Sequence, residues 1–219
     1  MNRKLHAEFL ATSKGITSQL HHAIYECGSL PKQRPNDQPL VTVMCRTIAG
    51  QQLSVKAART IWSRVVADSG STPLPKYLTK ASPSQLRACG LSRAKGRAMK
   101  EIATASNSGR LEARKLQALP HQERSHQLME IWGVGQWTAD MIGIFYFDDH
   151  DVWPESDITV AKTLQRLIGY RRKTMLAADQ FAPQRSFLAR YIWKIADASP
   201  NNNQNSRPGG SHHVCPVRT

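Results

Sequence analysis

IWGVGQWT, residues 131–138, places two glycines on either side of one valine, between two stretches whose apolar residues recur at helical spacing. A glycine inside a helix costs roughly 1 kcal/mol relative to alanine. The pair therefore predicts a tight hairpin between two helices. In such a hairpin, Gly133 and Gly135 allow positive φ and a close backbone approach, and Val134 packs between the helices.

This hairpin also predicts an anion site. The second helix would begin at Gln136, where the first N–H groups have no partner within the helix and the helix dipole presents positive charge. Because Gly135 has no side chain, a phosphate can approach these donors, and Thr138 offers a hydroxyl to the same anion. The alternative is an ordinary connection whose glycines serve only packing, and the motif alone does not decide between the two.

The composition favours a globular protein with a polyanionic partner. The chain has 219 residues, 40% of them hydrophobic, which suits one or two domains with a buried core. It contains neither the roughly 18 consecutive apolar residues of a transmembrane helix nor the apolar stretch of a signal peptide. An intracellular location is therefore expected, in the cytoplasm or nucleoid, or in a nucleus. The net charge of +14 favours nucleic acid as the partner.

The cysteines give no sign of a disulfide framework, because the four of them stand far apart and form no CxxC pair. In the tail, His212, His213 and Cys215 lie close together but lack a second ligand pair at suitable spacing, so a zinc site there is a weak alternative. Residues 200–219 contain almost no apolar side chains and are expected to be disordered.

Strand patterns are scarce, and the apolar spacing predicts an all-α protein of about ten helices. Two helices joined at GQQLS are predicted within residues 40–67, the second capped by Ser54. A short helix over 82–88 begins with Ser82 and Pro83. The other predicted helices are one or two within residues 5–27, then 93–107, 121–131, 136–147, 157–168 with Gly169 as its end, and 183–197.

Residues 131–145, IWGVGQWTADMIGIF, resemble the hairpin motif of the helix-hairpin-helix (HhH-GPD) DNA glycosylase superfamily. In that family a single aspartate follows at the start of the next helix, and DVWPESDITVAKTLQRL supplies Asp157, twenty-two positions after Gly135. Three further segments are similar to the family: TIAGQQLSVKAARTIWSRV, CGLSRAKGRAMKEIA and PQRSFLARYIW. The segments keep the family's order over roughly residues 38–195 and most resemble the 3-methyladenine DNA glycosylase II branch of alkylation repair.

The resemblance implies a two-lobed all-α fold over residues 1–199, with the active site in the cleft between the lobes. The middle lobe is expected at about residues 40–150, and the second lobe from 1–39 plus 151–199. The implied activity is that of a monofunctional, monomeric glycosylase that hydrolyses the N-glycosidic bond of alkylated purines in duplex DNA.

Two features of the sequence narrow that activity. Trp137 stands where strand-cutting members carry a lysine, and an indole cannot form a Schiff base, so no lyase activity is expected. The closely spaced C-terminal cysteines that an iron–sulfur cluster needs are missing from the sequence. No metal or organic cofactor is therefore expected, with a cation at the hairpin left as an open alternative.

Asp157 is the expected catalytic residue, and as a preferred N-cap it also has a structural explanation. The two roles are compatible, because a helix N-terminus favours an ionised carboxylate. Breaking an N-glycosidic bond leaves positive charge on the sugar, and a carboxylate about 4 Å away stabilises it by several kcal/mol. The carboxylate can act on the oxocarbenium ion directly or orient the attacking water, and the sequence does not choose between these.

The flipped, cationic base needs a pocket, and the gap that it leaves needs a filler. Trp137 is the first candidate for stacking and cation–π attraction, with Tyr146 and Trp153 as companions; core packing is an equal alternative for Trp153. In the GQQLS turn, Gln52, Leu53 or both are expected to fill the gap, the alternative being a simple turn between helices.

Basic residues at a helix start complete the predicted DNA contacts. Arg93 and Lys95, together with Arg97, stand at the positive end of a helix, which is unfavourable by about 0.3–1 kcal/mol each unless a phosphate offsets it. These side chains can instead bend back into water. The predicted DNA-binding set consists of Gly133, Val134, Gly135, Gln136, Thr138, Gln52, Leu53, Arg93 and Lys95.

Two other functions stay open from the sequence. The protein can be a glycosylase for another damaged base, such as a deaminated or oxidised purine. It can also be a non-catalytic protein that binds DNA through the hairpin. Release of free bases from damaged DNA separates these possibilities.

Overall fold

The computed structural model describes residues 3–198, which form thirteen α-helices and, within that range, no β-strand. The helices are α1 (Arg3–Ile16), α2 (Ser18–Cys27), α3 (Leu40–Gly50), α4 (Val55–Ser69), α5 (Leu74–Lys80), α6 (Pro83–Ala88), α7 (Arg93–Asn107), α8 (Ala113–Gln117), α9 (His121–Met129), α10 (Gln136–Phe145), α11 (Ile158–Ile168), α12 (Thr174–Asp179) and α13 (Arg185–Ala198). The predictions of disorder over 200–219 and of a weak zinc site at His212, His213 and Cys215 lie outside the described residues. Among the described helices, none has the length and apolar character needed to cross a membrane.

The predicted helices are confirmed most closely where a capping residue marks their ends. Ser54 begins α4 by accepting a hydrogen bond from the Ala57 N–H at 3.3 Å. Ser82 and Gln85 form a capping box at the start of α6, in which each side chain bonds the other residue's backbone N–H. At the other end of a helix, Gly169 closes α11 with φ of +90°. Each of these signals is local, which is why the sequence reveals it.

Three short helices, α5, α8 and α12, are not indicated by the sequence patterns. α5 lies just after the end of α4, where two prolines stand close together. Pro73 is its N-cap and Pro75 lies in its first turn, where a missing N–H needs no partner. α8 and α12 have five and six residues, and their N-cap residues make no side-chain capping bond. Helices this short show neither a clear period nor a cap in the sequence.

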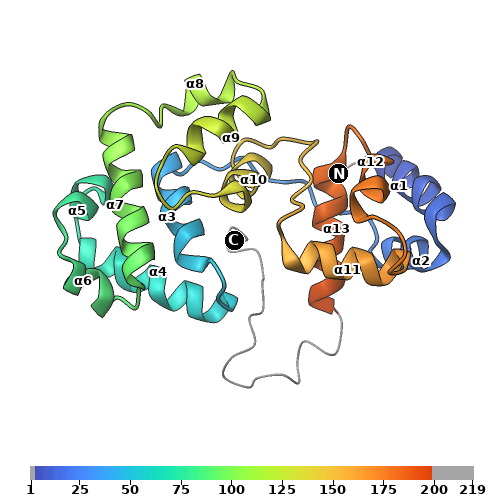
Figure 1. The fold of residues 1–219 in the computed structure, drawn as a ribbon, viewed down its shortest axis with the longest axis horizontal. Helices are drawn as coiled ribbons and strands as arrows, with labels where there is room; N and C mark the ends of the chain where they lie inside the picture. The colour runs from blue at the N-terminus through green and yellow to red at the C-terminus, as the bar shows by residue number, and fades with distance from the viewer. Residues whose placement is uncertain (1–2, 199–219) are drawn as a thin grey trace. The chain divides into compact units, whose positions relative to one another are not determined.

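The described chain forms two compact units and passes between them after Pro35 and after Phe147. In the unit of residues 36–147, α3 is buried along most of its length and packs against α4, α7 and α10 (Figure 1). Met44 and Ile48 of α3 are fully buried in its core, together with apolar residues of α7 and α10. The turn after α3, the start of α7 and the hairpin before α10 are thus built on one core.

The other unit, residues 3–35 and 148–198, brings together helices from the two ends of the described chain. α13 packs against α2 and α11, and α1 packs against α2 (Figure 1). Leu20 and Ile24 of α2 and Leu188 of α13 are fully buried here. This packing supports α11, the helix that begins after Asp157.

Candidate nucleic-acid interface and catalytic carboxylate

The hairpin between α9 and α10 uses its first glycine for packing. Gly133 has φ of +86°, and a Cβ at this position would lie 2.5 Å from the Cβ of Ala98 on α7. Val134 is buried, and its N–H donates to the Ile131 carbonyl at 3.0 Å. The positive φ and the close contact both require glycine. Gly133 therefore allows the hairpin to pack closely against α7.

The second glycine has no comparable structural reason. Gly135 is the N-cap of α10 with φ of −103°, a conformation open to any residue, and a Cβ there would meet no atom of the described chain within 4 Å. Gly135 offers no capping side chain, and both it and Gln136 are exposed. An external acceptor can thus approach the first N–H groups of α10, as the phosphate interpretation requires.

Thr138 has a different role from the one expected. Its side chain is buried, with 1% exposed, and its hydroxyl accepts a hydrogen bond from Gln51 Nε2 at 2.9 Å. A buried hydroxyl cannot contact a phosphate at the surface, so Thr138 links α10 to the turn after α3 instead. The Gln136 side chain is also engaged, because its Nε2 donates to Asp140 Oδ1 at 2.7 Å. Gln136 can therefore bind an anion only through its backbone N–H.

The turn between α3 and α4 is strained at its tip. Gln52 has φ of +56° and is exposed, while the following Leu53 is partly buried. The Leu53 N–H donates to the Gly50 carbonyl at 3.2 Å, which closes the turn. A left-handed conformation costs a residue with a side chain about 1–2 kcal/mol, and such residues cluster at functional sites. Gln52 is thus the residue of this turn with a strained, left-handed backbone.

The side chain of Lys95, a predicted phosphate contact, has two hydrogen-bond partners within the fold. Its Nζ donates to the carbonyls of Ala49 at 2.9 Å and Gln51 at 2.6 Å, where α3 ends. A lysine at a helix C-terminus bonds the last carbonyls and complements the dipole. Burial lowers the pKa of Lys95 from its ordinary value. Lys95 thus stabilises the strained turn. Arg93, the first residue of α7 after the Ser92 N-cap, is exposed.

Asp157 is the N-cap of α11, as predicted. Its Oδ1 accepts a hydrogen bond from the Val160 N–H at 2.9 Å, and its own N–H donates to the Pro154 carbonyl at 2.9 Å. Only 3% of the residue is exposed. These bonds hold the carboxylate at the positive end of a helix of eleven residues. The local geometry fixes the position of the carboxylate.

The aromatic residues proposed for base stacking differ in exposure. Trp137 lies in the first turn of α10 and is partly buried. Tyr146, just after α10, contacts Phe147 edge to face with ring centroids 4.9 Å apart, and burial raises the pKa of its hydroxyl. Trp137 and Tyr146 both belong to the unit of residues 36–147.

Trp153 belongs to the other unit and precedes Asp157 by four positions. Its ring is buried, with 8% exposed, which agrees with the core-packing alternative. Its buried Nε1 nevertheless donates to no atom of the described residues. Buried tryptophan N–H groups usually find an acceptor.

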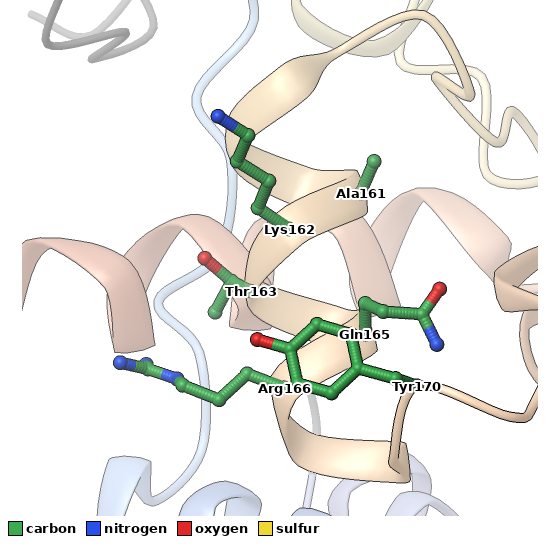
Figure 2. A pocket seen from close by; sticks show the side chains of 6 residues that line it. All are labelled: Ala161, Lys162, Thr163, Gln165, Arg166 and Tyr170. Atoms are coloured by element: carbon green, nitrogen blue, oxygen red, sulfur yellow. The ribbon is translucent and has the colours of Figure 1, made fainter.

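A hollow of about 520 Å³ lies along α11, the helix that Asp157 caps. Figure 2 shows its lining: Ala161, Lys162, Thr163, Gln165, Arg166 and Tyr170. None of the residues predicted for the site lines it. Its two cations and its open form do not suit a cationic base.

The fold and these motifs agree with the comparisons to known proteins. The chain matches the HhH-GPD superfamily of base excision DNA repair proteins over residues 45–182, and it belongs to that superfamily. It is 31% identical over 176 residues to DNA-3-methyladenine glycosylase 1 of Schizosaccharomyces pombe, a match that covers 77% of this chain and 75% of the relative.

Two solved structures share the fold closely. The 3-methyladenine DNA glycosylase of S. pombe, in complex with abasic DNA, matches with a TM-score of 0.74 and 27% identity, over 85% of this chain and 95% of that chain. The DNA-3-methyladenine glycosidase of Bacillus halodurans matches with a TM-score of 0.70 and 26% identity, over 90% and 91%. The expected all-α fold and superfamily are thereby confirmed.

Several residues that position the candidate site are not indicated by the sequence. Gln51 holds Thr138, and Ala98 receives Gly133, yet each partner lies far away along the chain. Trp132, directly before the hairpin, is 42% exposed, and the sequence gives no sign of that exposure.

Proposed function

We propose that this protein is a monofunctional DNA glycosylase that hydrolyses the N-glycosidic bond of alkylated purines in duplex DNA, the first step of base excision repair. The relatives described above are named as 3-methyladenine DNA glycosylases or glycosidases, which supports this proposal. The observation that carries the proposal is Asp157, a buried carboxylate held as the N-cap of the helix that follows the hairpin. In this proposal the protein binds duplex DNA, acts as a monomer and is located where the cell keeps its DNA.

The proposed chemistry requires one negative group and no general acid. A purine alkylated at N3 or N7 already carries positive charge, so the base leaves readily. Cleavage then concentrates positive charge on the sugar, which the Asp157 carboxylate stabilises electrostatically, either directly or through an oriented water. Trp137 cannot form a Schiff base, so the reaction ends with an abasic site and an intact strand.

The test of this function is release of free bases from methylated duplex DNA, followed by chromatography. Duplexes containing hypoxanthine or 8-oxoguanine are treated in parallel. Release of 3-methyladenine or 7-methylguanine supports the proposal. Release from only the hypoxanthine or 8-oxoguanine duplex indicates the alternative glycosylase, and tight binding without any release indicates a non-catalytic binding protein.

The backbone N–H groups at the start of α10 bind a DNA phosphate in this proposal. Gly135 supports this contact, because neither the φ of Gly135 nor its surroundings explain the absence of a side chain. A phosphate at this helix terminus meets unpaired N–H donors and the positive end of the dipole. Exposed basic residues such as Arg93 add charge.

The strained turn provides the wedge that fills the gap of the flipped base, and substitution distinguishes its two candidate residues. Gln52→Gly should raise stability by about 1 kcal/mol, since glycine adopts positive φ without strain, and should lower base flipping if Gln52 is the wedge. Leu53→Ala should lower flipping if Leu53 is the wedge. The fluorescence of 2-aminopurine next to the lesion measures flipping, and thermal unfolding measures stability. Unchanged flipping in both variants would rule out a wedge in this turn.

Trp137 is proposed to stack on the extruded base. Trp137→Ala should slow release of 7-methylguanine about 10- to 100-fold, because stacking on an aromatic ring contributes about 1–3 kcal/mol per base. Trp137→Phe, which keeps a ring, should recover most of the rate, and thermal unfolding of both variants checks that they are folded at the assay temperature. An alanine variant with the parent's rate would exclude Trp137 from the pocket.

A further inference from the structure

Arg97 of α7 and Trp132, the residue before the hairpin glycines, form an exposed pair. The guanidinium carbon of Arg97 lies 4.0 Å from the centroid of the Trp132 ring. Arg97 is exposed, and 42% of Trp132 is exposed. Tryptophan is the ring that binds a cation most strongly from its face. The contact therefore holds an otherwise flexible side chain in one place at the surface.

The stacking contact leaves the hydrogen-bonding edge of Arg97 unused. No hydrogen bond or ion pair joins its guanidinium to any residue between 3 and 198. A guanidinium is planar, so an aromatic ring occupies its face while its five N–H donors point outward in the plane. Such an edge binds a phosphate through two parallel hydrogen bonds.

The charge at the start of α7 is unfavourable without an anion. α7 has no acidic residue in its first turn, and its positive end instead carries Arg93 and, one turn later, Arg97. The helix dipole opposes Arg93 in the first turn, and repulsion between like charges four residues apart opposes the Arg93–Arg97 pair, while Glu101 lies four residues after Arg97 on the same helix. Lys95, the third cation of this segment, is occupied by the α3 carbonyls. An external anion near Arg97 would offset these costs.

The hairpin packing places this cation close to the start of α10. Gly133 lies against Ala98, the neighbour of Arg97, so α7 and the hairpin meet at this point. Trp132 is three residues before Gly135, and three residues span at most about 10 Å. One DNA strand carries a phosphate about every 3.4 Å along the helix axis. A strand held at α10 therefore has further phosphates within reach of the guanidinium.

We propose that Arg97, oriented by stacking on Trp132, binds a backbone phosphate of the DNA strand whose neighbouring phosphate sits at the N-terminus of α10. This inference rests on the proposed function only in taking DNA as the ligand. It requires no base excision. Trp132 is a positioning residue, and its effect on DNA passes through Arg97.

The salt dependence of binding to a short undamaged duplex tests the phosphate contact. Arg97→Gln should weaken binding about tenfold near 0.1 M salt and reduce the slope of log K against log salt by about 1. Arg97→Lys, which keeps the charge, should restore the slope but only part of the affinity. Arg114→Gln, which removes an exposed arginine of α8, is the matched control and should leave the slope as in the parent. An unchanged slope for Arg97→Gln, or an equal loss in the control, overturns the proposal.

A double-mutant cycle tests the positioning role of Trp132. Trp132→Leu should weaken binding in the parent and have no further effect in the Arg97→Gln background. Equal effects in both backgrounds would mean that Trp132 does not act through Arg97. Base release by the parent is measured separately. A parent that binds DNA but releases no base refutes the proposed glycosylase activity, and the salt slopes then still test the phosphate contact of Arg97.

Discussion

Asp157→Asn is expected to lower the rate of base release by about a thousandfold while leaving the protein as stable as the parent. A carboxylate about 4 Å from the developing positive charge contributes about 4 kcal/mol at an effective dielectric constant of about 20. That energy corresponds to about three powers of ten in rate. The asparagine keeps the size of the side chain and loses only the charge that the chemistry uses.

The fold should tolerate this change because asparagine is as good an N-cap as aspartate. Its amide oxygen can accept the same hydrogen bond from the Val160 N–H that Asp157 Oδ1 accepts in the structure. Asp157→Ala is the matched variant, because it removes both charge and cap and should cost about 0.5–2 kcal/mol of stability. Chromatography of released bases and thermal unfolding, run on all three proteins, separate the two roles.

An Asp157→Asn variant that releases bases within tenfold of the parent would contradict the catalytic assignment. Asp157 would then be a helix cap and nothing more, and the charge that stabilises the sugar would have to come from elsewhere. Loss of release together with a large loss of stability in this variant would instead mean that the assay reports unfolding.

Substituting the two hairpin glycines should have opposite effects on stability. Gly133→Ala is expected to destabilise the protein by about 3 kcal/mol or more, since it combines a left-handed backbone with overpacking. The new methyl group would lie 2.5 Å from the Ala98 Cβ and 3.3 Å from its Cα, so the hairpin must move away from α7. Denaturant or thermal unfolding measures the loss.

Gly135→Ser should stabilise the protein and weaken its binding to DNA. At the N-cap, with φ of −103° and ψ of 178°, a serine hydroxyl can accept a hydrogen bond from the first turn of α10. The gain is expected to be a few tenths of a kcal/mol, because glycine is already a moderate cap. The same hydroxyl would occupy the donors proposed for the phosphate. Titration of undamaged duplex DNA measures the loss of affinity.

The two outcomes are independent. If Gly135→Ser binds DNA as tightly as the parent, the start of α10 is not the phosphate site. If Gly133→Ala is as stable as the parent, the close contact between the hairpin and Ala98 is wrong.

Prediction from the sequence worked where one or two turns of chain contain the whole signal. The caps at Ser54, Ser82 and Asp157 could be predicted because donor and acceptor lie three residues apart. The hairpin could be predicted because glycine is unfavourable inside a helix. The short helices α5, α8 and α12 could not, since they are too short to show a period.

The roles of individual polar side chains were harder to predict. Lys95 has the sequence context of a phosphate ligand, and it bonds carbonyls forty-four and forty-six residues earlier in the chain. Thr138 follows the hairpin as an anion ligand would, and its partner Gln51 lies eighty-seven residues away. No local spacing encodes such partners, because they depend on how α3, α7 and α10 pack.

By itself, the sequence of this protein determined the all-α class, the capped helix starts, the hairpin and the superfamily, because each depends on residues that are neighbours along the chain. Only the tertiary structure decided that Gly133 is needed for packing and Gly135 is not, that Lys95 and Thr138 serve the fold, and that Arg97 rests on Trp132. The physical reason is that burial and hydrogen bonding are settled by the partners that packing brings together.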